Sequence, residues 1–295
     1  MAELSHANFV RNTNKGGNLI YDFSASEAPV LMREVGRLRE ISFRMAGGGT
    51  GLEVDIDDFD TSDIPFRQLI VWDPKDLEIL GGYRYIKCKD LPLSQEGTKF
   101  LATSHMFHFS DDFIRDFFPK TIELGRSFVQ PIYQSSRMGA KSLYALDNLW
   151  DGLGSLIVDN PDLDYFFGKV TMYAHFNTQA RNLIMALWHK YFGDPSRMVY
   201  AYKPLAVGLS DDVIKSIFTA DSFSDDYKIL VRKVRELGVN IPPLVNAYMT
   251  LSPSMKVYDT AINDEFGDVE ETAILINVHD LYASKSARHI DTYKK

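Results

Sequence analysis

The amino-acid sequence predicts an α/β fold in which a single domain fills the chain. Short apolar runs rich in β-branched and aromatic residues alternate with longer segments whose apolar residues recur at helical spacing. With 295 residues, 45% of them hydrophobic, the chain can bury one large core or two small ones. No repeat, linker or compositional break divides it. We therefore expect one domain over residues 1–295, with strands and helices interleaved throughout.

Composition excludes several classes of protein. The formal net charge is −8, whereas a nucleic-acid-binding protein would normally carry a basic surplus, so we expect no nucleic-acid partner. The single cysteine, Cys88, rules out an internal disulfide and favours a reducing compartment. We find no signal peptide and no apolar window long enough to span a bilayer. We expect a cytoplasmic protein, with peripheral membrane contact left open.

The first third of the chain is expected to contain a leader, a helix and three strands. Residues 1–18 are polar and predict a loose N-terminal leader, and residues 19–23 suit a short edge strand. Apolar residues from Val30 onward recur at helical spacing, which predicts a helix to about residue 45. Two further strands are expected over residues 66–72 and 79–86, joined by a turn that begins at Asp-Pro.

An acidic segment lies between this helix and the strands. Four of the six residues from Asp55 to Asp60 are aspartates. Their spacing does not fit an EF-hand, which requires oxygen ligands at alternate positions and a glycine at the sixth. A solvated acidic turn and a carboxylate cluster beside a reactive site both stay open. His105 and His108 lack a nearby set of ligands, so we expect no metal site.

The central unit runs from Thr121 to Trp150. Residues 122–129 suit a buried strand, and Pro131 has no N–H for a strand ladder, so regular pairing should end there. A small polar loop follows over residues 134–140, and a helix with one apolar face begins directly after it. A glycine-containing loop that opens a helix can hold a phosphate on its unpaired N–H groups, although an ordinary strand–helix unit looks the same.

Alternating strands and helices continue toward the C-terminus. Residues 195–295 are expected to form a C-terminal extension packed on the core. The predicted elements are strands at 165–172, 199–207 and 272–278, and helices at 178–191, 210–218 and 225–237.

Several of these motifs, taken in order, resemble a known family. The residues that carry the resemblance are Leu38-Arg39, Phe43, the Asp55–Asp60 segment, Arg84 and Glu123-Leu124-Gly125-Arg126-Ser127-Phe128-Val129. They are similar to those of the acyl-homoserine-lactone synthases. They are more similar still to the ornithine-lipid and glycine-lipid N-acyltransferases, which are also labelled haemolysin-like acyltransferases. The Glu-Leu-Gly-Arg-Ser-x-Val segment is the most specific part.

This resemblance implies a GNAT-like fold, with a central mixed β-sheet splayed at the acyl-donor site and flanked by helices. It implies transfer of a (3-hydroxy)fatty acyl group to the α-amine of an amino acid, glycine or ornithine, in lyso-aminolipid synthesis. The implied donor is the phosphopantetheine thioester of acyl carrier protein, or acyl-CoA, and no tightly bound cofactor is expected. Two alternatives stay open: an acyl-homoserine-lactone-type signal synthase, and a non-catalytic module that binds acyl chains or carrier protein.

The family's donor site maps onto the loop after the central strand. The implied pantetheine-binding residues are Val129, Gln134, Arg137, Gly139, Ala140 and Lys141. Arg137 stands where acetyl-CoA-binding loops have glycine, and this departure favours a protein-borne pantetheine. Acyl carrier proteins are acidic, so we expect Arg137 and Lys141 at the entrance, together with Arg181 or Lys190.

The resemblance also implies the residues for chemistry. The catalytic candidates are Glu123, Arg126 and Asp57, and the surrounding substrate-binding or structural network is Arg39, Phe43, Asp55, Asp60 and Arg84. Glu123 is the first choice for the base that deprotonates the amine, and an arginine would anchor the acceptor carboxylate. A buried ion network that only shapes the loop is the competing interpretation. Glu123 and Arg126 would share a site only if the strand has a bulge near Gly125, because residues three apart otherwise face opposite ways.

Overall fold

The computed structural model describes residues 2–134 and 140–294. Its strands are β1 (Asn8–Asn12), β2 (Leu19–Phe23), β3 (Arg67–Asp73), β4 (Glu78–Lys87), β5 (Phe107–Phe109), β6 (Thr121–Val129), β7 (Tyr165–Met172), β8 (Val199–Ala201), β9 (Lys256–Asn263) and β10 (Val269–Asn277). Its α-helices are α1 (Pro29–Met45), α2 (Asp58–Thr61), α3 (Gln95–Thr98), α4 (Asp111–Asp116), α5 (Ala140–Asp159), α6 (Thr178–Phe192), α7 (Asp211–Ile217), α8 (Phe223–Glu236), α9 (Pro243–Met249) and α10 (Ala283–His289).

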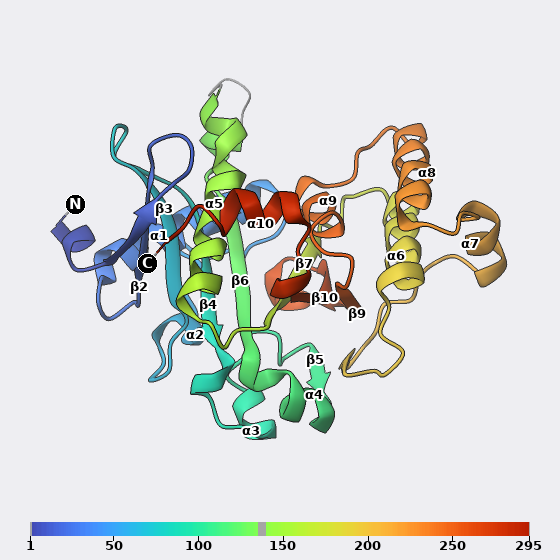
Figure 1. Ribbon diagram of the computed structural model, residues 1–295, viewed down its shortest axis with the longest axis horizontal. Helices are drawn as coiled ribbons and strands as arrows, with labels where there is room; N and C mark the ends of the chain where they lie inside the picture. Colours follow the sequence, from blue (N-terminus) through green and yellow to red (C-terminus); the bar gives the residue numbers. More distant parts are fainter. Residues whose placement is uncertain (1, 135–139, 295) are drawn as a thin grey trace.

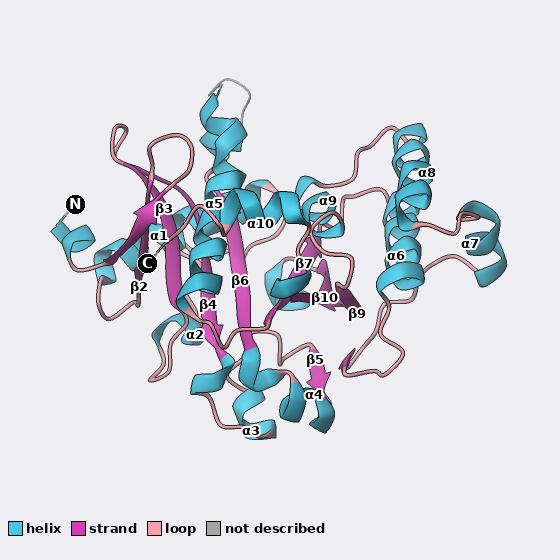
Figure 2. Cartoon of the chain, viewed as in Figure 1, coloured by secondary structure: helices cyan, strands magenta, loops and turns pink. Residues whose placement is uncertain are grey.

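One large sheet organises the molecule, with strand order β1-β2-β3-β4-β6-β7-β10-β9 (Figure 1). β6 and β7 run parallel and are joined through α5, whereas the other neighbouring strands of this sheet run antiparallel. Helices lie on both sides of it (Figure 2). The predicted α/β class and the mixed sheet flanked by helices are confirmed.

Alternate residues of a strand belong to hydrophobic cores on opposite faces of the sheet. On β3, Leu69 and Val71 join the core beneath α5 and α6, while Ile70 and Trp72 join the core beneath α1. A third core, which includes Phe113 and Phe167, lies beneath α4. Because both faces are covered, the central strands are apolar on both sides, as the sequence of β3 shows. The sheet therefore positions its side chains between packed layers on both faces.

The two ends of the chain are more ordered parts of the fold than the sequence predicted. Residues 1–18 are not a loose leader, because β1 forms the edge of the sheet and the Asn14 N–H donates to the Asp151 carboxylate on α5 at 2.8 Å. β1 was not predicted, because most of its residues are exposed and its sequence is largely polar. Residues 195–295 do more than pack on the core, because β9 and β10 belong to the sheet itself.

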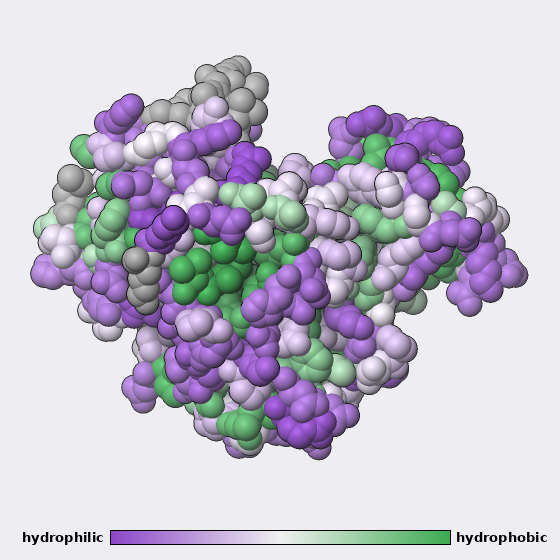
Figure 3. Space-filling view, in the orientation of Figure 1, coloured by the Kyte–Doolittle hydropathy of each residue, from purple (hydrophilic) through white to green (hydrophobic). Residues whose placement is uncertain are grey.

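For the other predicted elements, the observed bounds differ from the predicted ones mainly at the ends. β7 has the predicted bounds, and α1 and α6 differ from the predictions by one residue. The strand predicted over 199–207 stops at Ala201, since Pro204 cannot donate to a ladder. Among the described helices, none is both long and apolar enough to cross a membrane. The surface is hollowed between α5 and the lobe that α6 and α8 form (Figure 3).

Candidate active site

The sheet opens between β6 and β7. Within the described residues, the two strands pair from Thr121 with Tyr165 to Leu124 with Gly168 and not beyond. Past this point β6 continues to pair with β4, and β7 with β10. A Cβ atom at residue 168 would lie 2.7 Å from the Leu124 carbonyl oxygen, so glycine is required where the strands part. The predicted splay is therefore present.

A bulge in β6 follows at once. Gly125 pairs with Arg84, and Phe128 pairs with Gly82, so two residues of β6 oppose the single residue Tyr83. The bulge predicted near Gly125 is confirmed, but the left-handed conformation falls on Arg126, with φ +49°. That conformation is uncommon for a residue with a side chain. The ion pairs of Arg126 hold it in place.

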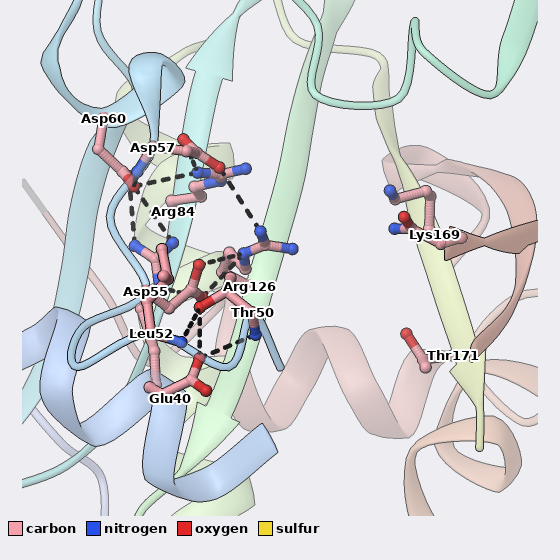
Figure 4. A network of polar contacts seen from close by, with 12 residues as sticks. Glu40, Thr50, Leu52, Asp55, Asp57, Asp60, Arg84, Arg126, Lys169 and Thr171 are labelled. Atoms are coloured by element: carbon pink, nitrogen blue, oxygen red, sulfur yellow. Dashed lines mark hydrogen bonds and ion pairs between the residues drawn. The ribbon is translucent and has the colours of Figure 1, made fainter. Parts of the chain in front are cut away.

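A buried ion network lies beside this bulge (Figure 4). Arg39 Nε on α1 contacts Asp55 Oδ2 at 3.1 Å, and both Arg39 terminal nitrogens contact the Asp60 carboxylate at 3.2 Å. Arg84 Nη1 on β4 contacts Asp60 Oδ2 at 3.1 Å. These four side chains are at most 2% exposed. Because the buried charges compensate one another, this inner part of the network is a structural clamp between α1, α2 and β4.

Asp60 is the centre of that clamp. Its carboxylate also accepts hydrogen bonds from Gln68 Nε2 at 2.9 Å and from the Asp57 N–H at 3.2 Å. Burial opposes its ionisation, but the guanidinium groups of Arg39 and Arg84 outweigh burial and hold the Asp60 pKa well below its usual range. Gln68 was not among the predicted residues, and only its proximity in the fold identifies it.

Arg126 and Asp57 form the open corner of the network. Arg126 Nε contacts Asp55 Oδ2 at 2.9 Å, and its Nη2 contacts Asp57 Oδ2 at 3.5 Å. Asp57 also receives Arg84 Nη1 at 2.6 Å. The Arg126 side chain is 15% exposed and that of Asp57 is 31% exposed, in contrast to the inner clamp. A ligand could therefore reach this pair of opposite charges.

Phe43 supports the open corner indirectly, through the ring of Phe266. The Arg126 guanidinium lies 4.1 Å from the centre of the Phe266 ring, and Phe43 packs edge-to-face against that ring. Nearby, the Glu40 carboxylate accepts the backbone N–H groups of Thr50 and Gly51, both at 2.9 Å. These contacts tie the loop after α1, residues 47–51, back to that helix.

Glu123 lies apart from Arg126. It is 1% exposed, and its two carboxylate oxygens accept the backbone N–H groups of Ala102 and Thr103 at 2.9 and 3.0 Å. Burial raises the Glu123 pKa to about 7, although the Thr103 and Ala102 hydrogen bonds and the charge of Lys169 oppose the rise. Glu123 and Arg126 do not contact each other directly, because the Glu123 carboxylate binds the backbone of residues 102–103 and Arg126 pairs with Asp55 and Asp57. A carboxyl that titrates near neutral pH can still exchange protons during a reaction.

The predicted donor loop is described only at its edges. Val129 is the last residue of β6, and its carbonyl accepts the Gln134 side-chain N–H at 2.6 Å. Arg137 and Gly139 lie outside the described residues, as do the side chains of Ala140 and Lys141 at the start of α5. The two other cations expected at the entrance are already paired, because Arg181 contacts Glu270 at 3.0 Å and Lys190 contacts Asp226 at 2.6 Å.

A second polar cluster, which sequence reasoning missed, faces the opening from β7. Lys169 Nζ contacts Glu271 Oε2 at 2.6 Å, and the Thr171 hydroxyl donates to Glu271 Oε1 at 3.2 Å. Asn263 Nδ2 on β9 donates to Glu271 Oε2 at 2.9 Å. Lys169 and Thr171 lie across from Arg126 (Figure 4). A lysine within the apolar run of β7 was the available sequence signal.

Comparison with known proteins identifies related chains. Residues 38–143 match the family described as an acetyltransferase (GNAT) domain. The glycine N(alpha)-acyltransferase of Bacteroides thetaiotaomicron is 55% identical over 292 residues, which cover 99% of this chain and 87% of that protein. The glycine N(alpha)-acyltransferase of Phocaeicola vulgatus is 51% identical over 294 residues, which cover 100% of this chain and 90% of that protein. The resemblance drawn from the motifs is confirmed.

Solved structures of acyl-homoserine lactone synthases are also similar. The CoA-dependent synthase BjaI, with SAM and isopentyl-CoA, aligns over 92% of this chain and 88% of that chain, at 12% identity and a TM-score of 0.43. The synthase LasI aligns over 53% of this chain and 74% of that chain, at 15% identity and a TM-score of 0.30.

Proposed function

This chain belongs to the family of the glycine N(alpha)-acyltransferases and is an N-acyltransferase, and from this premise we propose its two substrates. The acceptor is the α-amine of glycine, and the donor is the thioester of a (3-hydroxy)fatty acid on acyl carrier protein. The product is a single-chain N-acylglycine, a lyso-aminolipid. One observation carries the proposal: the splay between β6 and β7 is flanked by the open Arg126–Asp57 corner and by Glu123, whose pKa lies near neutral.

The splay supports binding of a thioester. Where β6 separates from β7, backbone N–H groups of β6 have no strand partner on that side, and the bulge at Arg126 turns the backbone further. Such groups can donate to the thioester oxygen as negative charge develops on it. A pantetheine arm would lie along β6 toward the loop before α5.

The open corner supports binding of an amino acid. Glycine carries an ammonium and a carboxylate, and the Arg126–Asp57 pair presents one charge for each. A guanidinium holds a carboxylate through two parallel hydrogen bonds. Because Arg39 and Arg84 are enclosed by aspartates, Arg126 is the arginine of this network best placed to anchor the acceptor.

The reaction then needs one proton acceptor. The neutral amine attacks the thioester carbon, a C–N bond forms, and the C–S bond breaks to release the pantetheine thiol. The bound ammonium first loses one proton to solvent. During attack the amine gives up a second proton to Glu123, directly or through water, and Glu123 passes this proton to the leaving thiolate. A base with a pKa near 7 is suited to this transfer at neutral pH.

A competition assay tests the choice of substrates. The purified protein is incubated with 3-hydroxyacyl carrier protein or the matching acyl-CoA, and with an equimolar mixture of amino acids that includes glycine and ornithine. We expect mass spectrometry to find N-acylglycine as the dominant product and faster turnover of the carrier-protein thioester. Dominant acylation of another amino acid, or preference for acyl-CoA, would contradict the proposal.

A further inference from the structure

The polar cluster on β7 and β10 has no role in the chemistry described above. Lys169 is the first residue of β7 beyond its last pair with β6, so it stands at the apex of the splay. Glu123 lies opposite Phe167 in register, and Lys169 is two residues further along the strand. Lys169 and Glu123 therefore point to the same face of the sheet.

The position of Lys169 is firmly fixed. Its side chain is 12% exposed and pairs with Glu271, which is 4% exposed. Thr171 and Asn263 hold the Glu271 carboxylate from two other directions. Burial opposes ionisation of Glu271, but the charges of Lys169 and, to a smaller degree, of Arg126 contribute to lowering its pKa, so the cations on the two sides of the opening lie within electrostatic reach of one carboxylate.

The apex also holds an unpaired donor. Arg84 Nε is buried and has no hydrogen-bond partner among the residues that the structure describes. It faces Gly125, where an added Cβ would lie 3.6 Å from Arg84 Nε. A buried, charged donor without an acceptor is unfavourable, so Arg84 Nε is available to a water molecule or to a ligand atom at this point. The apex thus has a cationic group on each side of the opening, Arg126 on β6 and Lys169 on β7.

We propose that Lys169, held by Glu271, is a second carboxylate-binding residue of the acceptor site, so that the acceptor carboxylate lies between Arg126 on β6 and Lys169 on β7. This inference rests on the proposed function, because it assumes an amino-acid acceptor. Contacts from both strands would fix the amine beside the thioester at the apex. They would also reject amines that lack a carboxylate, because two cations would then face each other across an apolar or neutral group.

The test compares glycine with glycinamide, which has the same shape but no carboxylate. Wild-type protein, Lys169→Met and the double variant Lys169→Met/Glu271→Gln are assayed for kcat/KM with both acceptors. The double variant removes both charges, so it leaves no buried charge unpaired and keeps the test valid if the single variant fails to fold. Lys120→Met is the control, since Lys120 also pairs with a carboxylate, that of Asp164, at the other end of these strands.

We expect wild type and Lys120→Met to prefer glycine strongly. Loss of Lys169 should reduce the ratio of glycine to glycinamide kcat/KM by about tenfold or more, chiefly through the glycine KM, because a hydrogen bond between charged groups is lost. An unchanged ratio in the folded variants would overturn the proposed role of Lys169 and would leave the proposed function standing. A wild-type protein that acylates neither acceptor would overturn the proposed function as well.

Discussion

Two buried carboxyl groups of this protein have opposite properties. Asp60 faces the guanidinium groups of Arg39 and Arg84, so its pKa is lowered and it stays ionised. Glu123 is equally buried, and burial raises its pKa to about 7, because the hydrogen bonds from two backbone N–H groups oppose the effect of burial only in part. A permanent anion can support structure, whereas a group that titrates near neutral pH can move a proton. The difference in environment therefore assigns the two carboxyl groups different roles.

Replacement of Glu123 by Gln should separate catalysis from folding. Gln keeps the shape, and its single carbonyl oxygen can still accept one of the two N–H groups of Ala102 and Thr103, so we expect a folded protein. Turnover should fall at least about tenfold, the lower part of what a general base contributes. In wild type, turnover should rise with pH through about 7 as Glu123 deprotonates, and this rise should disappear in the variant. The measurement is kcat against pH.

Glu123→Gln should also change how the free energy of unfolding depends on pH. Because the folded-state Glu123 pKa is raised from 4.5 to about 7, the folded protein holds its proton more tightly than the unfolded chain does. Wild type should therefore lose unfolding free energy on the order of 3 kcal/mol as pH rises from about 4.5 to 7. Glu123→Gln should lack this loss in urea denaturation. Equal pH dependence in both proteins would argue against the raised pKa.

Arg126→Lys tests the acceptor anchor. Lysine keeps the positive charge but loses the planar fork that contacts Asp55 and Asp57 and can bind a carboxylate. We expect the KM for glycine to rise by about tenfold, with a smaller change in kcat and in the KM for the donor. Steady-state kinetics with each substrate varied in turn checks this. A change confined to the donor KM would indicate that Arg126 binds the acyl donor and would contradict its role as the acceptor anchor.

At the scale of elements, the ion network joins pieces that are distant in the sequence. Asp60→Asn should leave Arg39 and Arg84 buried with too little negative charge, and we expect a loss of about 3 kcal/mol or more in unfolding free energy. Asp58→Asn is the matched control, because Asp58 is exposed on the same helix. The two variants are compared by urea denaturation. Equal stability would show that the inner clamp contributes little.

Strong periodic patterns allowed much of the fold to be predicted. α1 and β7 were predicted to within one residue because their apolar residues have a clear period. β9 was not predicted, because polar residues such as Lys256, Asp259 and Asn263 interrupt its apolar ones. Its identity as a strand depends on pairing with β10, and pairing between segments cannot be read from one strand alone.

The site was predicted only in part, because some of its contacts depend on backbone groups or on strand pairing. Motif order indicated Arg39, Asp55, Asp60, Arg84 and Arg126, and the fold brings these five residues together. The partners of Glu123 are backbone groups about twenty residues earlier in the chain, and backbone groups leave no signal in the sequence. Lys169 and Glu271 become neighbours only because β7 pairs with β10.

On the scale of the whole molecule, the net charge of −8 opposes docking of an acidic carrier protein unless cations gather at one place. Since Arg181 and Lys190 are paired, we expect Arg137 and Lys141 to provide that attraction. Changing both to Glu should weaken use of acyl carrier protein, more at low salt than at high salt. The double variant Lys228→Glu/Arg232→Glu on α8 controls for net charge, because it replaces two exposed cations in the same way. Unchanged carrier-protein kinetics at every salt concentration would refute this expectation.

The central claim is that this protein joins a carrier-bound fatty acyl group to the amine of glycine. A single-turnover reaction with 3-hydroxyacyl carrier protein and ¹⁵N-labelled glycine tests it most directly, with mass spectrometry of the product and titration of the released thiol. We predict one ¹⁵N-labelled N-acylglycine for each thiol released, and at least about tenfold slower formation with Glu123→Gln. Release of thiol with free fatty acid in place of the amide, or an intact thioester, would contradict the account.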